Sequence, residues 1–298
     1  MRSTLADPAG DVPVRVNRHQ LAGSISLPLL VTVFAFLVLF WTPITTLMRD
    51  WWSDPEAGHG LLLGPVSIWL AWKRGLAPDS RPQPRLGLAI LAFAVLMRYA
   101  SGLAAELFTM RVSLMLAAAG LVIFYLGFRQ ILHWWLPVLL LALSIPLPSV
   151  VLSSLALPLQ LQASRFGAAM LEWRHVPVVL SGNVIQLPSR SLFVTEACSG
   201  LRSLTALLAL GTLMGGLWLR MPALRFLLVL IAIPVAMLLN GLRIFLTGFF
   251  VYYVSPALGD GIMHYTEGWA LFAVAFLIVG FVCWALSSLE TIWQERGA

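Results

Sequence analysis

Long apolar stretches follow one another along almost the whole chain, and this pattern limits the possible folds more than any other feature of the sequence. A helix that crosses the hydrocarbon core of a bilayer needs roughly 20 apolar residues. Only 11% of the 298 residues are charged, which is too few to cover the surface of a soluble domain of this length. The sequence therefore predicts an all-α integral membrane protein.

We expect about eight transmembrane helices. The first apolar stretch is too long for the core of a signal peptide and has no cleavage site after it, so we interpret it as a retained first helix. The predicted helices are 21–40, 58–72, 86–103, 113–128, 131–147, 200–219, 226–250 and 266–287. The predicted organisation is a cytoplasmic tail (1–20), helices one to five (21–147), a periplasmic segment (148–197), helices six to eight with the candidate catalytic residues (198–287) and a second cytoplasmic tail (288–298).

Basic residues are distributed unevenly between the two ends of these helices, and cytoplasmic loops usually carry the excess. With the N-terminus inside, 11 of the 19 basic residues are cytoplasmic, namely Arg2, Arg15, Arg18, Lys73, Arg74, Arg81, Arg85, Arg129, Arg220, Arg225 and Arg296. Six are outside, namely Arg49, Arg98, Arg111, Arg165, Arg174 and Arg190, and Arg202 and Arg243 fall within helices. This favours an N-in/C-in topology, and it explains the net charge of +6 without nucleic acid binding.

The segment from Pro148 to Ala197 is not typical of a spanning helix. Its first part intersperses polar residues among leucines, which predicts an amphipathic helix lying on the periplasmic surface; these residues are Gln160, Gln162, Ser164, Arg165 and Glu172. Two β-branched runs then flank Ser181-Gly182-Asn183, which predicts a β-hairpin. A third run, 192–194, leads to the next helix. We expect a small periplasmic cap that delivers the chain to Cys198.

Cys198 stands at the predicted start of the sixth helix, where the helix dipole favours a thiolate. Arg202 is four residues further on and shares its helix face, and Glu196 precedes it. A cysteine is more often a small buried apolar residue, and Cys283, in the middle of an apolar helix, fits that description. Cys283 is predicted roughly 25 Å below the outer end of its helix, so we expect no disulfide.

Ionisable groups within membrane helices are costly and are candidates for function. Asn240, Arg243 and Thr247 form one polar stripe on the seventh predicted helix, with Arg243 about two turns from its outer end. The alternative is a structural ion pair of Arg243 with Glu196 or Glu267, which would lock helices together.

Two histidines are further candidates at the same membrane level. His264 precedes the eighth predicted helix and is a candidate proton carrier, as histidines often are; its alternative role is interfacial, beside Tyr265 and Trp269. His59 lies at the outer start of the second predicted helix, where the sequence favours a helix-start or interfacial role over a catalytic one.

The topology predicts that Cys198, Arg243 and His264 meet at one outer level. They would supply a nucleophile, an oxyanion stabiliser and a proton carrier, which are the parts that acyl transfer needs. Arginine is permanently charged, so it cannot be the base. The sequence has no zinc-type Cys/His spacing, phosphate loop or dinucleotide fingerprint, and we expect neither a metal nor a cofactor.

The motifs around these residues resemble those of the exosortase/archaeosortase family. They are Glu196-Ala-Cys-Ser-Gly-Leu-Arg-Ser203, Asn240-Gly-Leu-Arg-Ile244 and His264, with supporting likeness in the 53–60 and 182–188 segments. The resemblance implies a membrane cysteine peptidase or transpeptidase of Gram-negative bacteria. Its partners would be exported proteins whose carboxy-terminal sorting signal combines a Pro-Glu-Pro-type motif, a transmembrane helix and a basic cluster.

By the same resemblance Cys198 matches the nucleophile, Arg243 the essential arginine and His264 the third member of the set. Arg202 matches a supporting position, and Glu196, Asn240, His59 and Glu267 are our further candidates for substrate binding or support. The acceptor nucleophile is left open, so transpeptidation and hydrolysis are both possible.

Two other functions compete with this interpretation. A transporter or lipid-linked glycan handler would use Arg202, Asn240 and Arg243 to line a path for an anionic substrate. The gathering of charges on one side argues against it, because a path must reach both sides. A non-catalytic scaffold would use the polar groups only to pair helices.

Overall fold

The computed structural model describes residues 27–188, 190–194, 200–255 and 262–296, with the backbone alone at 262–268 and 296. The chain divides into two compact units, Met1–Thr42 and Pro43–Ala298. The first contains α1 (Leu27–Leu39), which has no buried residue and is apolar on all sides, as expected of a helix surrounded by lipid. Helix α2 (Trp41–Ser53) begins in the first unit and continues into the second.

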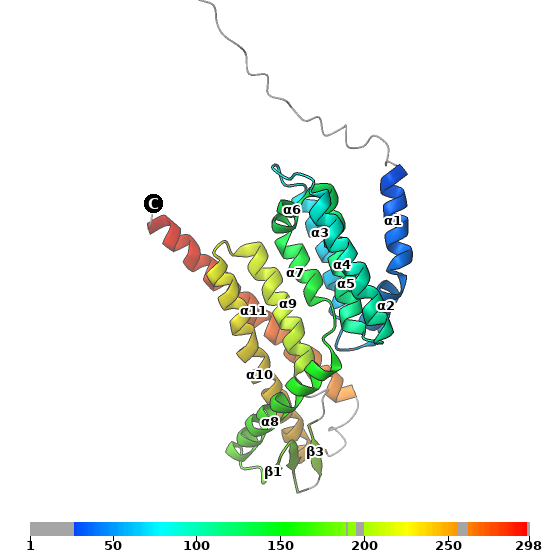
Figure 1. Cartoon of the computed structure of the whole chain (residues 1–298). Helices are drawn as coiled ribbons and strands as arrows, with labels where there is room; N and C mark the ends of the chain where they lie inside the picture. The colour runs from blue at the N-terminus through cyan, green and yellow to red at the C-terminus, as the bar shows by residue number, and fades with distance from the viewer. Residues whose placement is uncertain (1–26, 189, 195–199, 256–261, 297–298) are drawn as a thin grey trace, which may run out of the picture. The chain divides into compact units, whose positions relative to one another are not determined.

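The second unit consists of helices and one small sheet (Figure 1). Its further helices are α3 (Gly60–Arg74), α4 (Pro84–Leu103), α5 (Leu107–Leu126), α6 (Phe128–His133), α7 (Trp135–Leu143), α8 (Ser149–Trp173), α9 (Leu201–Trp218), α10 (Pro222–Tyr253) and α11 (Ile262–Arg296). Strands β1 (Val179–Ser181), β2 (Val184–Gln186) and β3 (Ser191–Phe193) form an antiparallel sheet in that order. The sheet and α8 lie at one end of the unit, and α3 ends and α10 begins at the other.

Within the described residues, five helices are long and apolar enough to cross a membrane: α4, α5, α9, α10 and α11. A sixth span results if α1 and α2 are counted together as one bent span. The multi-pass helical architecture predicted from the sequence is therefore confirmed. The count of about eight spans is not reached, and the N-in/C-in orientation stays a prediction.

Two predicted spans account for most of the difference. Helix α3 has 15 residues and ends in Lys73 and Arg74, so it is shorter than a full crossing requires. The predicted range 131–147 is interrupted at Trp134, which separates α6, with 6 residues, from α7, with 9. Helix α2, in contrast, lies between the predicted ranges 21–40 and 58–72, where no helix was expected.

Helix α5 begins well before its predicted start because Glu106 caps it. The Glu106 carboxylate accepts hydrogen bonds from the backbone N–H groups of Phe108 (2.9 Å) and Thr109 (2.7 Å). The Thr109 hydroxyl donates to the same carboxylate at 2.5 Å, and this bond is the main cause that lowers the pKa of Glu106. The early start brings Arg111 into the second turn of α5.

An ion pair between a buried arginine and a half-buried aspartate links α5 to α2 within the second unit. Arg111 is 3% exposed, and its Nη2 lies 2.5 Å from Asp50 Oδ2. The same nitrogen donates to the carbonyl of Thr46 at 3.4 Å. Since a charge buried in the protein needs a partner of opposite sign, this pair fixes α2 against α5.

Replacing Asp50 with Asn is expected to lower the free energy of unfolding by about 3 kcal/mol, because Arg111 would keep its buried charge without a carboxylate. Equilibrium unfolding in mixed micelles measures this loss. Asp79→Asn is the matched control: Asp79 lies 3.7 Å from Arg129, both side chains are exposed, and its loss should cost less than about 1 kcal/mol. Equal losses in the two variants would contradict the role of the buried pair.

Helices α9, α10 and α11 share one apolar core. Its fully buried members include Leu207 on α9, Leu228 and Ala232 on α10, and Val279 on α11. Cys283 is a free thiol buried in this core, which confirms its predicted structural role. The core positions the start of α9 and the second half of α10 relative to each other.

Helix α8 packs closely along α10. A Cβ added at Gly167 would lie 2.5 Å from Ile244 Cγ2, and one added at Gly241 would lie 2.2 Å from Phe166 Cδ1, so the absence of side chains allows this approach. The predicted amphipathic helix is present, but two of its polar residues, Gln160 and Ser164, belong to its buried face. Leu155 and Leu157 of α8 are exposed instead, a distribution that suits contact with lipid.

The sheet covers α8 and the last third of α10. Val176, Ile185 and Val194 form one buried cluster with Ile244 and Val251 of α10. The predicted hairpin around Gly182-Asn183 is confirmed, with Ser181 paired to Val184, and the run at 192–194 contributes the third strand. The strands therefore lead the chain towards the start of α9.

Candidate functional site

The start of α9 lies directly against Asn240 of α10. Gly200, the residue that precedes α9, has a φ of +79°, in the left-handed region that glycine tolerates. A Cβ placed on Gly200 would lie 2.7 Å from Cγ of Asn240, so the backbone touches the amide. Asn240 itself is 6% exposed. Two motifs that are distant in the sequence thus meet at this point.

The chain on the other side of residues 195–199 is also fixed. Val194 is buried, its backbone N–H donates to the carbonyl of Asn183 at 2.9 Å, and its own carbonyl accepts from Asn183 Nδ2 at 3.0 Å. The same Nδ2 donates to Gln160 Oε1 of α8 at 3.4 Å. The segment that contains Cys198 therefore runs between two anchored points, Val194 and Gly200.

Arg243 and Thr247 continue the polar stripe on α10 beyond Asn240. Both are half-buried, and the Thr247 hydroxyl donates to the Arg243 carbonyl at 3.0 Å. Because α10 continues to Tyr253, Arg243 lies roughly three turns from its end, deeper than the two turns predicted from the sequence. Measured from Pro222 at 1.5 Å per residue, Arg243 follows about 30 Å of helix, which is the thickness of a hydrocarbon core.

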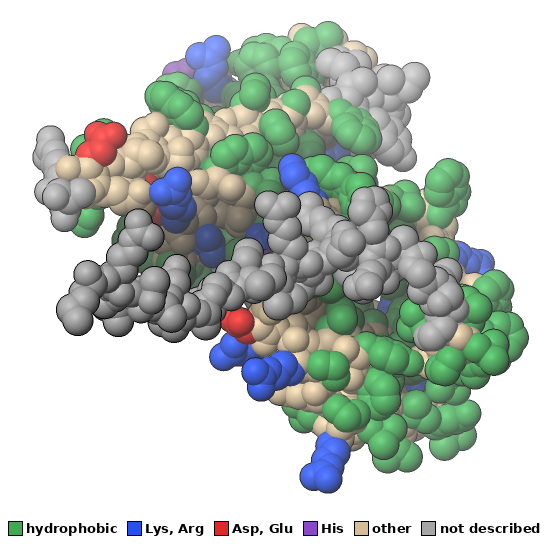
Figure 2. Space-filling view, turned by 90° about the horizontal axis from the view of Figure 1, so that it is seen from above, with side chains coloured by type: hydrophobic (Ala, Val, Ile, Leu, Met, Phe, Trp, Pro, Cys, Tyr) green, Lys and Arg blue, Asp and Glu red, His purple; other side chains and the backbone are tan. Residues whose placement is uncertain are grey.

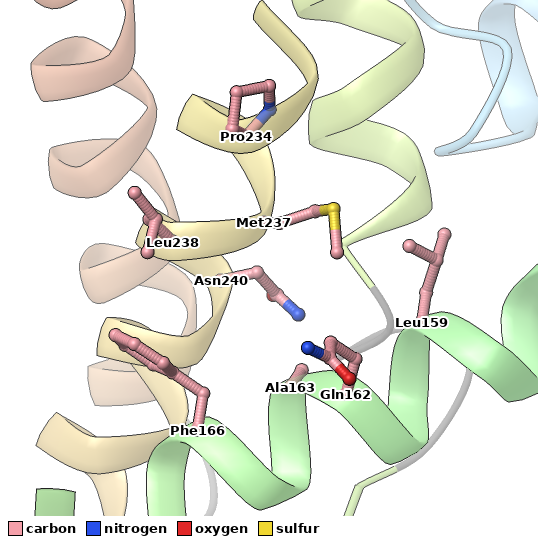
Figure 3. A pocket seen from close by; sticks show the side chains of 8 residues that line it. All are labelled: Leu159, Gln162, Ala163, Phe166, Pro234, Met237, Leu238 and Asn240. Carbon is pink, nitrogen blue, oxygen red and sulfur yellow. The ribbon is translucent and has the colours of Figure 1, made fainter.

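A cavity of about 220 Å³ lies between α8 and α10, beside Asn240 (Figure 3). Its lining residues are Leu159, Gln162, Ala163, Phe166, Pro234, Met237, Leu238 and Asn240. The lining is mostly apolar, and the side-chain amides of Gln162 and Asn240 face each other in the close view. A cavity of this size is smaller than a typical cofactor site but has room for one or two amino-acid side chains.

The remaining predicted site residues lie at the starts of α9 and α11 or outside the described residues. Cys198 and Glu196 lie outside the described residues. His264 and Glu267 belong to the first two turns of α11, which begins at Ile262 in the half of the second unit that holds α8 and the sheet; only their backbone is described. Arg202 is exposed on the first turn of α9. The described part of the chain thus joins Asn240 and Arg243 to the segment next to Cys198.

His59 has a structural contact. Its Nε2 lies 3.1 Å from the carbonyl of Leu143, the last residue of α7, and it must carry the proton because a carbonyl only accepts. The indole of Trp51 donates to the carbonyl of Ser144 at 2.8 Å. The two side chains satisfy carbonyls at the end of α7 that have no partner in the helix.

Within the described residues, no three His, Cys, Asp or Glu side chains form a group suited to a metal. The chemistry that the described site can offer is hydrogen bonding from amides, a positive guanidinium and an apolar recess.

The fold and the site together define a class: a multi-pass helical membrane protein with a small three-stranded sheet at one end and a polar cluster, Asn240, Arg243 and Thr247, on α10. The family model for transmembrane exosortases matches residues 51–281, and the chain belongs to this family. Exosortases are membrane-embedded sorting transpeptidases whose substrates carry sorting signals. Comparisons with curated proteins and with solved structures found no match.

Sequence reasoning missed the roles of Asn183, Gln160 and Gln162. Asn183 was recognised only as a turn residue, and the two glutamines only as polar positions of a surface helix. The one available signal was that an Asn side chain next to a turn glycine can bond the neighbouring backbone. The carbonyl that the Asn183 side chain reaches belongs to Val194, directly after the third strand, and no local sequence pattern predicts this contact.

Replacing Gly200 with Ala is expected to lower the rate at which a sorting-signal substrate is processed at least tenfold. The added methyl group introduces about 1–3 kcal/mol of backbone strain and forces Asn240 away. Gly182→Ala is the matched control, since Gly182 also has positive φ (+62°) but nothing lies within 4 Å of the added Cβ. Processing of a reporter substrate and thermal unfolding are measured for both. Equal loss of processing would show that backbone strain alone is responsible.

Proposed function

We propose that this exosortase is a cysteine transpeptidase or peptidase that cleaves carboxy-terminal sorting signals through a thioester on Cys198. The observation that carries the proposal is the contact between Gly200 and Asn240, at the junction of α9 and α10. It joins the motif that contains Cys198 to the helix that carries Arg243. The proposed catalytic set is Cys198, Arg243 and His264.

The covalent chain limits how far Cys198 can be from this junction. Cys198 is two residues before Gly200, and two residues of extended chain span at most about 7 Å. Arg243 is one helical turn after Asn240, on the same stripe. A long arginine side chain can therefore reach a substrate carbonyl that is held near the Cys198 sulfur.

The proposed reaction has two acyl-transfer steps. The Cys198 thiolate forms a bond to the scissile carbonyl carbon, and Arg243 stabilises the negative oxygen that develops. The C–N bond then breaks, and the leaving amine takes a proton from His264. An acceptor amine, hydroxyl or water next attacks the thioester and gives its proton to His264, which restores the thiolate.

The cavity beside Asn240 suits the side chain next to the scissile bond. Its apolar lining would take an uncharged residue of the sorting motif, and the amides of Gln162 and Asn240 can bond the substrate backbone. A charged side chain would be disfavoured there, because no described lining residue is charged. The uncharged lining of the cavity would therefore contribute to the selection of the sorting motif.

The outer side of the membrane is the proposed location of the reaction. Arg225 in the first turn of α10 belongs to the basic set predicted to be cytoplasmic, and Arg243 follows about 30 Å of helix from Pro222. The site would therefore open at the periplasmic edge of the inner membrane, where exported substrates arrive.

Trapping the thioester tests the proposal. The protein is incubated with a substrate peptide in detergent, quenched in acid, and digested for mass spectrometry. We expect the amino-terminal fragment of the substrate on Cys198, and its release by neutral hydroxylamine as a hydroxamate. Substrate turnover without any adduct on Cys198, or an adduct that survives hydroxylamine, would exclude an acyl-thioester.

A further inference from the structure

Two arginines share one indole ring at the end of the second unit opposite the sheet. Cζ of Arg225 lies 4.8 Å from the ring centroid of Trp135, and Cζ of Arg74 lies 5.5 Å from it. Each guanidinium is also tied to the backbone: Arg74 Nη1 donates to the carbonyl of His133 at 3.0 Å, and Arg225 Nε donates to that of Leu219 at 2.9 Å. Helices α3, α7 and α10 thus hold both cations at one place.

No carboxylate balances these two charges in the part of the chain that the structure describes. The ion pairs found there involve Arg111 and Arg129 instead. The buried carboxylate of Glu290 accepts from the backbone N–H groups of Arg220 and Met221. Burial and the charge of Arg225 both lower the pKa of Arg74, so the two guanidiniums repel each other. Such an arrangement favours an anion between or beside them.

The surroundings point to an anion that carries apolar chains. Trp72, two residues before Arg74, is 79% exposed, and Phe226, next to Arg225, is 70% exposed. Figure 2 looks onto this end and shows blue basic side chains standing among green apolar ones. A free phosphate would gain nothing from the exposed apolar side chains, whereas acyl chains would cover them.

The position along α10 fits the headgroup level of a bilayer. Arg225 and Arg243 are separated by roughly 27 Å of helix, close to the thickness of the hydrocarbon core. If Arg243 lies at one membrane surface, Arg225 lies at the other, where lipid phosphates are. Basic pockets between transmembrane helices on the cytoplasmic side are known to bind anionic headgroups.

We propose that Arg74 and Arg225, stacked on Trp135, bind the phosphodiester of an anionic phospholipid. Arginine suits this role because its planar fork can donate two hydrogen bonds to one phosphate. The Arg225 Nη groups and Arg74 Nη2 make no hydrogen bond to the described protein, and they remain available as donors. The acyl chains of the lipid would lie against Trp72 and Phe226.

Lipid binding to the purified full-length protein tests the proposal. Native mass spectrometry in detergent measures adducts with phosphatidylglycerol and with phosphatidylcholine of the same acyl chains. For Arg74→Gln/Arg225→Gln we expect about thirtyfold weaker phosphatidylglycerol binding. The control Lys73→Gln/Arg129→Gln removes two exposed charges at the same end and should bind within about threefold of the unaltered protein.

Several outcomes would overturn the proposal. Equal weakening in the two double variants would show diffuse electrostatic attraction, and equal binding of both lipids would show no preference for the anion. Full occupancy by inorganic phosphate in competition with the lipid would show a free-anion site. Arg225→Lys provides a second test in case the double variant misfolds. It keeps the positive charge but loses the planar guanidinium that can donate two hydrogen bonds to one phosphate, and we expect about tenfold weaker binding. Unchanged affinity in that variant would refute the site.

Discussion

Replacing Cys198 with Ala is expected to lower the processing of a sorting-signal substrate by roughly 10⁴-fold or more, because the variant has no sulfur to form the acyl intermediate. The protein should stay folded, since alanine is small and accepts most backbone conformations. The measurement is the appearance of the cleaved product from a reporter protein with a carboxy-terminal sorting signal, followed by gel or mass spectrometry.

Cys283→Ala is the matched control for this experiment. Cys283 is buried in the α9–α11 core, far along α11 from its start, so its loss should reduce stability slightly and leave processing unchanged. Undiminished cleavage by Cys198→Ala would remove the nucleophile assignment. If that variant also kept its function in cells while Arg243 variants lost it, a transport or glycan-handling role would be the better explanation.

Replacing Arg243 with Lys is expected to lower kcat by about 10²–10³-fold, with KM changed much less. Lysine keeps the positive charge but is a shorter point donor, so it would miss the position where the oxyanion develops. An interaction that forms only in the transition state affects kcat in this way. Single-turnover kinetics with saturating substrate separate this loss from a loss of binding.

Arg202→Lys provides the comparison for Arg243. Arg202 is exposed on the first turn of α9, two residues beyond Gly200, and we expect its variant to retain activity within a few fold. Equal losses in the two variants would indicate that both arginines bind substrate rather than stabilise the oxyanion. A rise in KM with unchanged kcat for Arg243→Lys would have the same meaning.

The sequence predicts the membrane architecture well where periodic apolar stretches are long. Helices α9 and α10 begin and end within a few residues of their predicted ranges, because charged residues and proline bound each apolar run. The prediction is poor where tertiary contacts decide the structure. Helix α2 includes Asp50, whose carboxylate meets Arg111 from another helix, and no local sequence pattern predicts that contact.

The candidate site was predictable as a set of residues but not as an arrangement. The spacing of Asn240, Arg243 and Thr247 gave the polar stripe, and the structure finds it buried or half-buried. The contact of Gly200 with Asn240 and the bonds of Asn183 to Val194 depend on elements that are far apart in the chain. For His59 the sequence favours a helix-start or interfacial role, and the position of Leu143 shows which carbonyl it contacts.

The continuity of α10 has a mechanical consequence. One helix carries Arg225 near its beginning and Arg243 after a further roughly 27 Å, so the depth of either guanidinium fixes the depth of the other. In a bilayer with shorter or longer acyl chains, α10 must then tilt, or one of its two arginines must leave the level of the membrane surface. Membrane thickness would thereby change the depth of Arg243, the proposed oxyanion stabiliser, relative to the membrane surface.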